Sequence, residues 1–401
     1  MLRLISRILI GLLFIFSGFI KAVDPVGGSI KFTDYFEAFG MDFLTGFALP
    51  LAIILSTIEF MIGFHLLVGI RLKQTSVAAF YLMVFFTSLT LILAIFNPVT
   101  DCGCFGDAIK LTNWETFFKN LISLPFTLIL FRDRNNSTEP VSYTRVNLLT
   151  LVSVIFGVGI SVHSYRHLPM IDFRPFKAGV NIPDGMKIPE GAPQAQYNTT
   201  FILEKNGTRK EFDENNYPYD DTSWVFIDSK SVLIKEGYQP PIKDFYITDK
   251  NGNDQSEQLL NSKKPVFLMI APDLKKVRPG QISRLKAINK ACHKKNIKFY
   301  CVTSSLYEDI LRFVMKSRSA MKYLFADEVF LQTLIRANPG LVVVKDGTIL
   351  AKYNYPDVPG PEIVNDPVSY VISHNSKQTE RMYVDITGLF LILSIILIYK
   401  K

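Results

Sequence analysis

Cysteine and charge are both scarce in this chain of 401 residues, which has 4 cysteines and 20% charged residues. So few cysteines exclude a disulfide-dense secreted module. The low charged fraction, beside 48% hydrophobic residues, excludes an intrinsically disordered protein and a coiled coil. No small-residue cleavage site follows the first apolar stretch, Leu4–Ala22, so this stretch is predicted to be a membrane helix rather than a signal peptide.

The hydrophobic residues are concentrated at the two ends of the chain, in about the first 165 positions and the last 20. The mean hydropathy is +0.21, which is high for a wholly soluble protein. This distribution predicts a membrane protein that carries a soluble domain. The formal net charge of +8 does not indicate nucleic-acid binding, because many of the basic residues flank apolar segments.

Six apolar stretches are candidates for membrane spans, since a hydrocarbon core about 30 Å thick needs roughly 20 helical residues. The fourth and the sixth are shorter than the others. The six are Leu4–Ala22, Phe47–Ile70, Thr75–Phe96, Phe117–Phe131, Val146–Val162 and Ile386–Tyr399.

Basic residues predict the orientation of these spans. Four clusters of Lys and Arg fall on one side of the membrane if both chain termini are cytoplasmic, which agrees with the positive-inside rule. The loops Lys21–Gly40 and Asn97–Glu115 and the long segment 164–383 then face outward. The four clusters are Arg3 with Arg7, Arg71 with Lys73, Arg132 with Arg134 and Arg145, and Lys400 with Lys401.

The outward loop Asn97–Glu115 contains Cys102, Gly103 and Cys104. Two cysteines one residue apart can close a small disulfide ring, for which Gly103 gives the backbone freedom. A strained and exposed disulfide exchanges readily with other thiols, so one interpretation is a thiol–disulfide exchange site. The alternatives are a structural disulfide that pins the loop, or two unpaired thiols packed against the bundle. A metal site is not predicted, because the outward loops of the bundle contain no histidine and no third cysteine.

Three charged residues are further candidates for the site. Lys21 and Asp24 lie at the exit of the first helix, where a cation near a thiol lowers the pKa of that thiol. Alternatively, Lys21 snorkels to the interface and Asp24 caps the next turn. Glu59 falls near the middle of the second span, where a carboxylate is costly; it is a candidate for a proton relay or for a base beside a quinone. The alternative for Glu59 is an interhelical hydrogen bond with a hydroxyl of the third span, from Thr87, Ser88 or Thr90.

A set of motifs runs through the first 130 residues: Ser17-Gly18, Lys21, Asp24-Pro25, Lys31, Tyr35, Glu59 and Cys102-Gly103-Cys104-Phe105-Gly106. This set resembles the DoxX/MauE-type four-helix membrane proteins. MauE-type proteins are implicated in forming disulfides in periplasmic methylamine dehydrogenase, and DoxX-type relatives include a subunit of a thiosulfate:quinone oxidoreductase. The resemblance therefore implies redox chemistry at Cys102 and Cys104.

The outward segment begins with an irregular, proline-rich tether over about residues 163–191. Phe201–Lys205 and Thr208–Phe212 flank Asn206-Gly207 and predict a β-hairpin, because Asn-Gly suits a type I′ turn. The other strand pair predicted in this region is Ser223–Asp228 with Ser231–Lys235.

The elements predicted beyond residue 240 are the strand Asp244–Asp249 with a turn at Asn251-Gly252, the strand Pro265–Ala271, the helix Gln281–Lys295, the strand Ile297–Thr303, the helix Tyr307–Lys316, and the hairpin of Gly340–Val344 with Thr348–Tyr353. A βαβ unit followed by a helix and a β-hairpin resembles the thioredoxin/peroxiredoxin fold. Asn338-Pro339, just before the hairpin, lies where that family carries its cis-proline.

The thioredoxin-like segment lacks the family's Cys-X-X-Cys, which would fall near Leu274–Val277. Thiol exchange needs a thiolate, so this segment is predicted to be redox-inactive. Cys292, on the apolar stripe of a helix, and Cys301, inside a buried strand, are predicted core residues, and a disulfide between them stays open. The groove beside Asn338-Pro339 is predicted to hold a client or partner in extended form. The alternative is a scaffolding domain with no redox role.

The predicted fold class is a membrane α-helical bundle with a soluble α/β domain. We expect five regions: a DoxX/MauE-like four-helix transmembrane domain over residues 1–132, a cytoplasmic loop and fifth transmembrane helix over 133–163, the periplasmic tether and β-hairpin region over 164–240, the thioredoxin-like periplasmic domain over 241–360, and a linker with a C-terminal transmembrane helix over 361–401.

These observations predict a bacterial inner-membrane protein that takes part in periplasmic thiol–disulfide exchange or electron transfer. Cys102 and Cys104 exchange, Lys21 and Asp24 tune them, and Glu59 handles protons or orients the bundle. No cofactor is expected. A quinone is the alternative electron acceptor, disfavoured because the bundle has one cysteine pair and not the two that a disulfide generator normally uses.

The expected partners are membrane lipid and a periplasmic client or redox protein, without nucleic acid and with the oligomeric state left open. The alternative function is a non-enzymatic membrane scaffold in which the Cys-Gly-Cys loop is structural. A third option is a small-molecule carrier, disfavoured because the sequence has no obvious inverted repeat.

Overall fold

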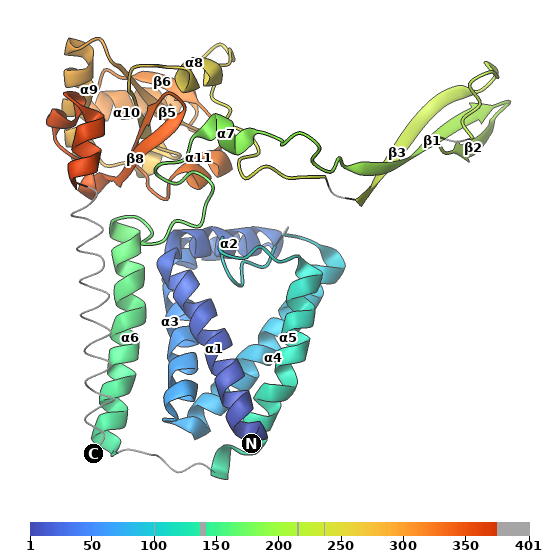
Figure 1. Ribbon diagram of the computed structural model, residues 1–401, viewed down its shortest axis with the longest axis vertical. Helices are drawn as coiled ribbons and strands as arrows, with labels where there is room; N and C mark the ends of the chain where they lie inside the picture. Colours follow the sequence, from blue (N-terminus) through green and yellow to red (C-terminus); the bar gives the residue numbers. More distant parts are fainter. Residues whose placement is uncertain (100, 137–141, 215, 236, 375–401) are drawn as a thin grey trace. The chain divides into compact units, whose positions relative to one another are not determined.

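The computed structural model describes residues 1–99, 101–136, 142–214, 216–235 and 237–374 (Figure 1). The chain divides into two compact units, of which the first is Met1–Val180 together with Tyr246–Lys401 and the second is Asn181–Phe245. The first unit contains a helical bundle and an α/β domain. The second contains a three-stranded sheet.

Five long helices form the bundle: α1 (Leu2–Val23), α3 (Ala48–Val68), α4 (Leu72–Phe96), α5 (Asn113–Arg132) and α6 (Tyr143–Arg166). Among the described residues, four segments are long and apolar enough to cross a membrane: α1, α4, α6 and the stretch Asp42–Val68, which includes α3. These segments mark the chain as a membrane protein. The predicted sixth span, Ile386–Tyr399, lies outside the described residues.

The fifth helix, α5, forms where the sequence predicts a short span at Phe117–Phe131, but it is not one of the four apolar segments. The reason is that its buried face is mostly polar. Asn120 Nδ2 donates to Thr90 Oγ1 of α4 at 3.2 Å, so this face is satisfied inside the bundle. The residues buried along α5 are Asn113, Thr116, Asn120, Ser123, Thr127 and Leu130.

A further helix, α2 (Pro25–Ala38), occupies most of the segment predicted as the loop Lys21–Gly40. Asp24 is its N-cap residue and accepts a hydrogen bond from the Gly27 amide at 2.8 Å, which confirms the predicted capping role. Figure 1 shows α2 lying across the ends of α1 and α3. A short 3₁₀-helix, Asp42–Phe47, leads from α2 into α3.

Helices α1 and α3 approach each other closely because glycines stand at their contact. A Cβ atom added at Gly18 would lie 2.3 Å from the backbone nitrogen of Phe60. One added at Gly63 would lie 2.4 Å from the backbone nitrogen of Ile15. Small residues allow such backbone contact between membrane helices, where dispersion and hydrogen bonds hold the helices together.

The α/β domain is built on a five-stranded sheet with the order β6-β5-β4-β7-β8. Strands β4, β5 and β6 are parallel, β7 is antiparallel to β4, and β7 and β8 form an antiparallel hairpin. All five residues of β4 are buried, which confirms the buried strand predicted at Pro265–Ala271. The strands are β4 (Val266–Ile270), β5 (Lys298–Thr303), β6 (Lys322–Phe325), β7 (Gly340–Lys345) and β8 (Thr348–Asn354).

Helices α9 (Ser283–Lys294) and α10 (Tyr307–Ser317) confirm the two predicted helices and pack apolar side chains against this sheet. Cys292 and Cys301 are free thiols in the same core, with no exposed surface. The shorter elements of this domain are α8 (Ser256–Leu260), α11 (Glu328–Leu334) and the 3₁₀-helices Leu274–Lys276, Pro279–Ile282, Tyr355–Asp357 and Pro361–Val364, and another 3₁₀-helix, Arg134–Asn136, follows α5.

The α/β domain differs from the sequence prediction at several places. The predicted strand Asp244–Asp249 is wrong, because Thr248 makes only isolated bridges, to Asp254 and Phe325. The sequence analysis also missed β6 and α11. They have four and seven residues, which is too short for a hydrophobic period to be recognised.

The second unit contains α7 (Ile182–Met186) and the antiparallel sheet β2-β1-β3. The hairpin of β1 (Gln196–Lys205) and β2 (Thr208–Phe212) confirms the prediction. The second predicted strand pair is wrong, because its two segments form one strand, β3 (Val225–Lys235), which pairs with β1.

Substitution of Gly18 by Ala should destabilise the bundle, because the added methyl group meets the backbone of α3. We expect a loss of about 1–3 kcal/mol, the usual cost of overpacking, measured by thermal unfolding of the purified protein in detergent. Gly159→Ala in α6 is the matched control, since no atom lies within 4 Å of its added Cβ. Equal stability of the two variants would contradict the close contact of α1 with α3.

Candidate functional site

A buried ion pair joins α1 to α3. Lys21 Nζ lies 2.6 Å from Glu59 Oε1 and 2.8 Å from Oε2, and the two side chains are 13% and 1% exposed. Ser17 Oγ, one turn before Lys21, lies 2.8 Å from Glu59 Oε2 and 2.9 Å from the carbonyl oxygen of Cys104. Because a hydroxyl carries one proton, Ser17 can donate to only one of these acceptors at a time.

Two of the predictions for these residues are wrong. Lys21 does not snorkel to the interface, because it turns inward and pairs with Glu59. Glu59 binds residues of α1 and not the hydroxyls of α4. Thr87 and Thr90 donate instead to carbonyl oxygens of their own helix, those of Met83 and Phe86.

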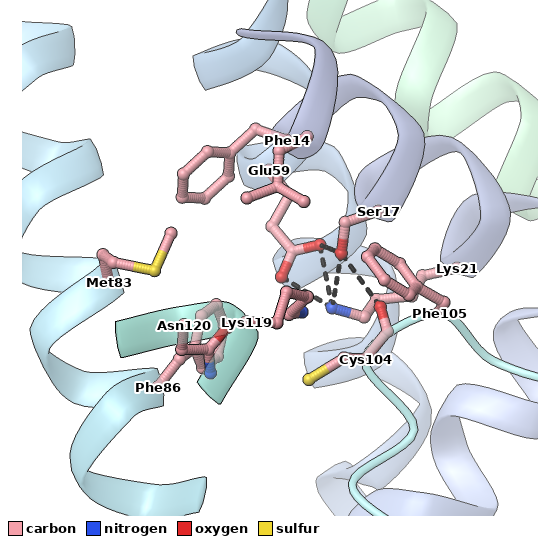
Figure 2. A pocket seen from close by; sticks show the side chains of 11 residues that line it. Phe14, Ser17, Lys21, Glu59, Met83, Phe86, Cys104, Phe105, Lys119 and Asn120 are labelled. Atoms are coloured by element: carbon pink, nitrogen blue, oxygen red, sulfur yellow. Dashed lines mark hydrogen bonds and ion pairs between the residues drawn. The ribbon is translucent and has the colours of Figure 1, made fainter. Parts of the chain in front are cut away.

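A cavity of about 20 Å³ lies beside the ion pair (Figure 2). Its wall includes Lys21, Glu59 and Cys104, together with Lys119 and Asn120 from α5. A volume of this size holds about one water molecule, and the polar groups around it offer that water partners. Cys104 and the buried ion pair therefore line one small cavity, whose wall also has apolar side chains.

The CGC loop, which we define as Asp101–Asp107, follows α4 and is held by several polar contacts. Gly103 has a φ of +62°, a conformation that glycine adopts without strain, and its amide donates to Asp101 Oδ1 at 3.0 Å. Asp101 in turn pairs with Lys31 of α2 at 3.0 Å. The hydroxyl of Tyr35, also in α2, donates to the carbonyl oxygen of Cys102 at 2.6 Å. Helix α2 thus fixes the backbone around both cysteines.

Cys102 and Cys104 are free thiols in the structure. The sulfur of Cys102 lies 3.3 Å from the amide nitrogen of Cys104 and 3.4 Å from Thr116 Oγ1. A hydrogen bond from the Cys104 side chain lowers the pKa of Cys102 to about 6; Thr116, the Cys104 amide and the charge on Lys119 also lower it, while burial raises it. The same hydrogen bond between the two cysteine side chains, together with burial, raises the pKa of Cys104 well above its ordinary value.

The two cysteines therefore differ in protonation near neutral pH. The lowered pKa of Cys102 favours its thiolate, which is the nucleophilic form of cysteine, and the raised pKa of Cys104 favours its thiol. Because the two thiols interact, they lose their protons in two steps, at well-separated pH values, and these steps are properties of the pair. Among the residues that the structure describes, no group of three or more His, Cys, Asp or Glu side chains could hold a metal ion.

The other two cysteines have a different environment. Burial raises the pKa of Cys292 to about 12 and raises that of Cys301 as well. Both are protonated at neutral pH and lie in the apolar core of the α/β domain, which agrees with their prediction as core residues. Each is therefore a suitable control for substitutions in the CGC loop.

Asp24 and the Asn338-Pro339 loop, predicted separately, meet through a residue that the sequence analysis missed. Arg336 Nε lies 3.0 Å from Asp24 Oδ2, and Arg336 Nη2 lies 2.8 Å from Asp107 Oδ2. The Asn338–Pro339 peptide bond is cis, as predicted. Nothing in the local sequence marks Arg336, because its two partners lie hundreds of positions away in the chain.

The bundle and its contacts define a helical membrane protein in which a dithiol loop lies against a buried Lys–Glu pair. Residues 1–132, which include α1 to α5, match the family described as methylamine utilisation protein MauE, and this confirms the MauE part of the predicted resemblance. Residues 197–236, with most of β1 and all of β2, match a domain of unknown function, DUF8463. No curated protein and no solved structure matches the chain.

Breaking the buried ion pair should cost more stability than removing it. We expect Lys21→Met or Glu59→Leu alone to lose about 3–5 kcal/mol, because each leaves one unpaired buried charge, and the double variant to lose clearly less than their sum. Chemical unfolding of the protein in detergent measures these changes. Lys31→Met is the control for a surface pair, with an expected loss of about 0–1 kcal/mol. Simple additivity of the two single losses would contradict the pairing.

The lowered pKa of Cys102 makes a prediction about reactivity. The rate of alkylation of Cys102 by iodoacetamide, followed by mass spectrometry, should rise with pH around a midpoint of about 6. In Cys104→Ala the thiol donor is absent, so the midpoint should move upward by more than one pH unit. Lys119→Gln should move it in the same direction by less. A midpoint near 8.5, the ordinary value for cysteine, in the protein without substitutions would contradict the lowered pKa of Cys102.

Proposed function

We propose that the protein takes part in thiol–disulfide exchange or electron transfer on the periplasmic side of a bacterial inner membrane. The observation that carries this proposal is the pair of free thiols, Cys102 and Cys104, in one loop, where the pKa of Cys102 is lowered and that of Cys104 is raised. An exchange site needs one sulfur ready to attack and a second to resolve the product. In this proposal both chain termini are cytoplasmic and the CGC loop faces the periplasm.

The reaction begins when the Cys102 thiolate attacks a disulfide of a partner protein. One partner sulfur leaves as a thiolate, and a mixed disulfide forms between Cys102 and the other. Cys104 then gives up its proton and attacks the Cys102 sulfur, which forms the Cys102–Cys104 disulfide and releases the second partner sulfur. Two electrons pass from the dithiol to the partner disulfide. The reverse sequence oxidises a partner dithiol.

The Lys21–Glu59 pair acts as the proton acceptor for Cys104 in this proposal. Cys104 has a raised pKa, so it needs a base before it can attack. Its side chain and the Glu59 carboxylate line the same cavity, which has room for one bridging water. Ser17 Oγ lies within hydrogen-bond distance of both the Glu59 carboxylate and the Cys104 carbonyl oxygen, so it links the base to the loop.

A partner protein is the proposed source and destination of electrons. The bundle has one cysteine pair, whereas a disulfide generator that passes electrons to a quinone normally relays them through a second pair. We therefore propose no bound cofactor.

The α/β domain is proposed to have a thioredoxin-like fold and to bind the client or partner. Its sheet order, with three parallel strands and an antiparallel hairpin, and its cis Asn338–Pro339 bond support this assignment. Residues 274–277, where the dithiol of such a fold would lie, include the 3₁₀-helix Leu274–Lys276 and no cysteine. The domain thus contributes binding rather than redox chemistry.

A scaffold with a structural Cys-Gly-Cys loop is the second candidate, and one observation favours it. Cys102 is only 9% exposed, and Tyr35 and Thr116 hold its backbone and its sulfur in place. A partner disulfide can reach this sulfur only if the loop moves.

Substitution of the two cysteines separates the candidates. Cys102→Ser should abolish reduction of a disulfide substrate, by at least 100-fold, at an unchanged protein level in membranes. Cys104→Ser should trap the partner as a mixed disulfide on Cys102, visible on a non-reducing gel and identified by mass spectrometry. Cys292→Ser is the control and should leave the rate as it is. Loss of protein level in both CGC variants, with no trapped partner, would favour the scaffold.

A further inference from the structure

Arg336 is a buried arginine whose three guanidinium nitrogens all make polar contacts. Its side chain is 9% exposed. Nε contacts Asp24 Oδ2 at 3.0 Å, Nη2 contacts Asp107 Oδ2 at 2.8 Å, and Nη1 donates to the carbonyl oxygen of Gln332 at 3.0 Å. We call Arg336 with its two aspartates the Arg336 clamp. Charge-assisted bonds of this kind fix orientation as well as distance.

The Arg336 clamp joins the two places that the sequence analysis singled out for function. On the bundle side, Asp107 closes the CGC loop, three residues after Cys104, and Asp24 caps α2. On the other side, Arg336 stands three residues before the cis-proline Pro339. Three residues span at most about 11 Å even when fully extended. Pro339 therefore lies within about 11 Å of Arg336, and Cys104 lies within about the same distance of Asp107, which Arg336 binds.

The position of Arg336 is itself supported by neighbouring charges. The carbonyl oxygens at the end of α11 accept from Arg336, from Arg174 Nη1 at 3.2 Å and from Lys352 Nζ at 3.2 Å. Cations at this end of a helix are favourable, because its last carbonyl groups have no partner within the helix. Asp172 pairs with both Arg174 and Lys352. Three cations and three carboxylates thus balance in one cluster.

We propose that the Arg336 clamp assembles a composite substrate site, in which the Asn338-Pro339 loop binds an extended polypeptide and the CGC loop supplies the thiols that react with its disulfide. This inference rests on the proposed function. It assigns Arg336 as a positioning residue, since Arg336 touches neither the thiols nor the substrate. The α/β domain, which has no cysteine at residues 274–277, receives its reactive pair from the bundle.

The ligand class follows from the groups that the loop offers. Asn338 Nδ2 donates to the carbonyl oxygen of Asp273 at 2.8 Å, which ties the loop to the 274–277 segment. Its Oδ1 is buried and has no hydrogen-bond partner among the described residues. A buried acceptor without a partner is costly, and a backbone N–H of an extended peptide that entered the loop would satisfy it. The redox step is the one described above, with the substrate disulfide as the oxidant of the Cys102–Cys104 pair.

The test compares two disulfides that release the same chromophore. One is 5,5′-dithiobis(2-nitrobenzoate), a small aromatic disulfide. The other is a 12-residue peptide whose central cysteine forms a mixed disulfide with 2-nitro-5-thiobenzoate. Reduced full-length protein in detergent is mixed with each, and the ratio of the peptide rate to the small-molecule rate is recorded. This ratio isolates recognition of the polypeptide from reactivity of the thiols.

In Arg336→Gln the ratio should fall at least tenfold, through a higher KM for the peptide, and Arg336→Lys should restore part of it. Asp107→Asn, which removes the charge of one of the two carboxylates that bind Arg336, should also lower the ratio and is the deciding variant if Arg336→Gln does not fold. Arg284→Gln is the matched control. Arg284 also donates to backbone carbonyl oxygens, those of Pro356 and Val358, but has no part in the clamp.

The outcomes separate this inference from the proposed function. A wild-type protein that reacts with neither disulfide, or that never forms the Cys102–Cys104 bond, overturns the proposed function and the composite site with it. A wild-type protein that reacts with both, and whose ratio is the same in the clamp variants and in Arg284→Gln, overturns the composite site alone. A fall of the ratio in the clamp variants only supports it.

Discussion

The Lys21–Glu59 ion pair is the interaction on which the rest of the bundle depends. A carboxylate in the middle of a membrane span is costly unless a cation meets it, and Lys21 does so from the neighbouring helix. The two residues can meet because glycines let the backbones of α1 and α3 approach. Ser17 then extends the same polar cluster to the Cys104 carbonyl, so the packing of two helices also determines the position of the dithiol loop.

The sequence was sufficient for much of this arrangement. The cost of a charge inside a membrane singled out Glu59, and the spacing of Cys102 and Cys104 singled out the loop. Long periodic or fully apolar segments, such as α9 and β4, were also predictable. The partner of Glu59 could not be predicted, because Lys21 lies 38 positions away and their contact depends on how each helix is rotated about its axis.

Other parts of the structure could not be predicted, because they are determined by contacts between distant parts of the chain. Helix α2 has little apolar patterning and is fixed by contacts of Lys31 and Tyr35 with the CGC loop. Strand β3 is long only because β1 pairs along it, although local propensity had suggested a turn between two shorter strands. Arg336 carries no local signal, since its role arises only when residues from three distant segments meet. Contacts between residues that are far apart in the sequence were therefore the part of the structure that could not be predicted.

The polar inner face of α5 has a consequence for how the protein is made. A helix that buries asparagine, serine and threonine side chains gains little by entering lipid alone. Its amides find their partners on α4, as the contact of Asn120 with Thr90 shows. Asn113 similarly bonds Asn97, the residue that ends α4. We therefore expect α5 to enter the bilayer together with α4, as a helical hairpin whose turn is the CGC loop.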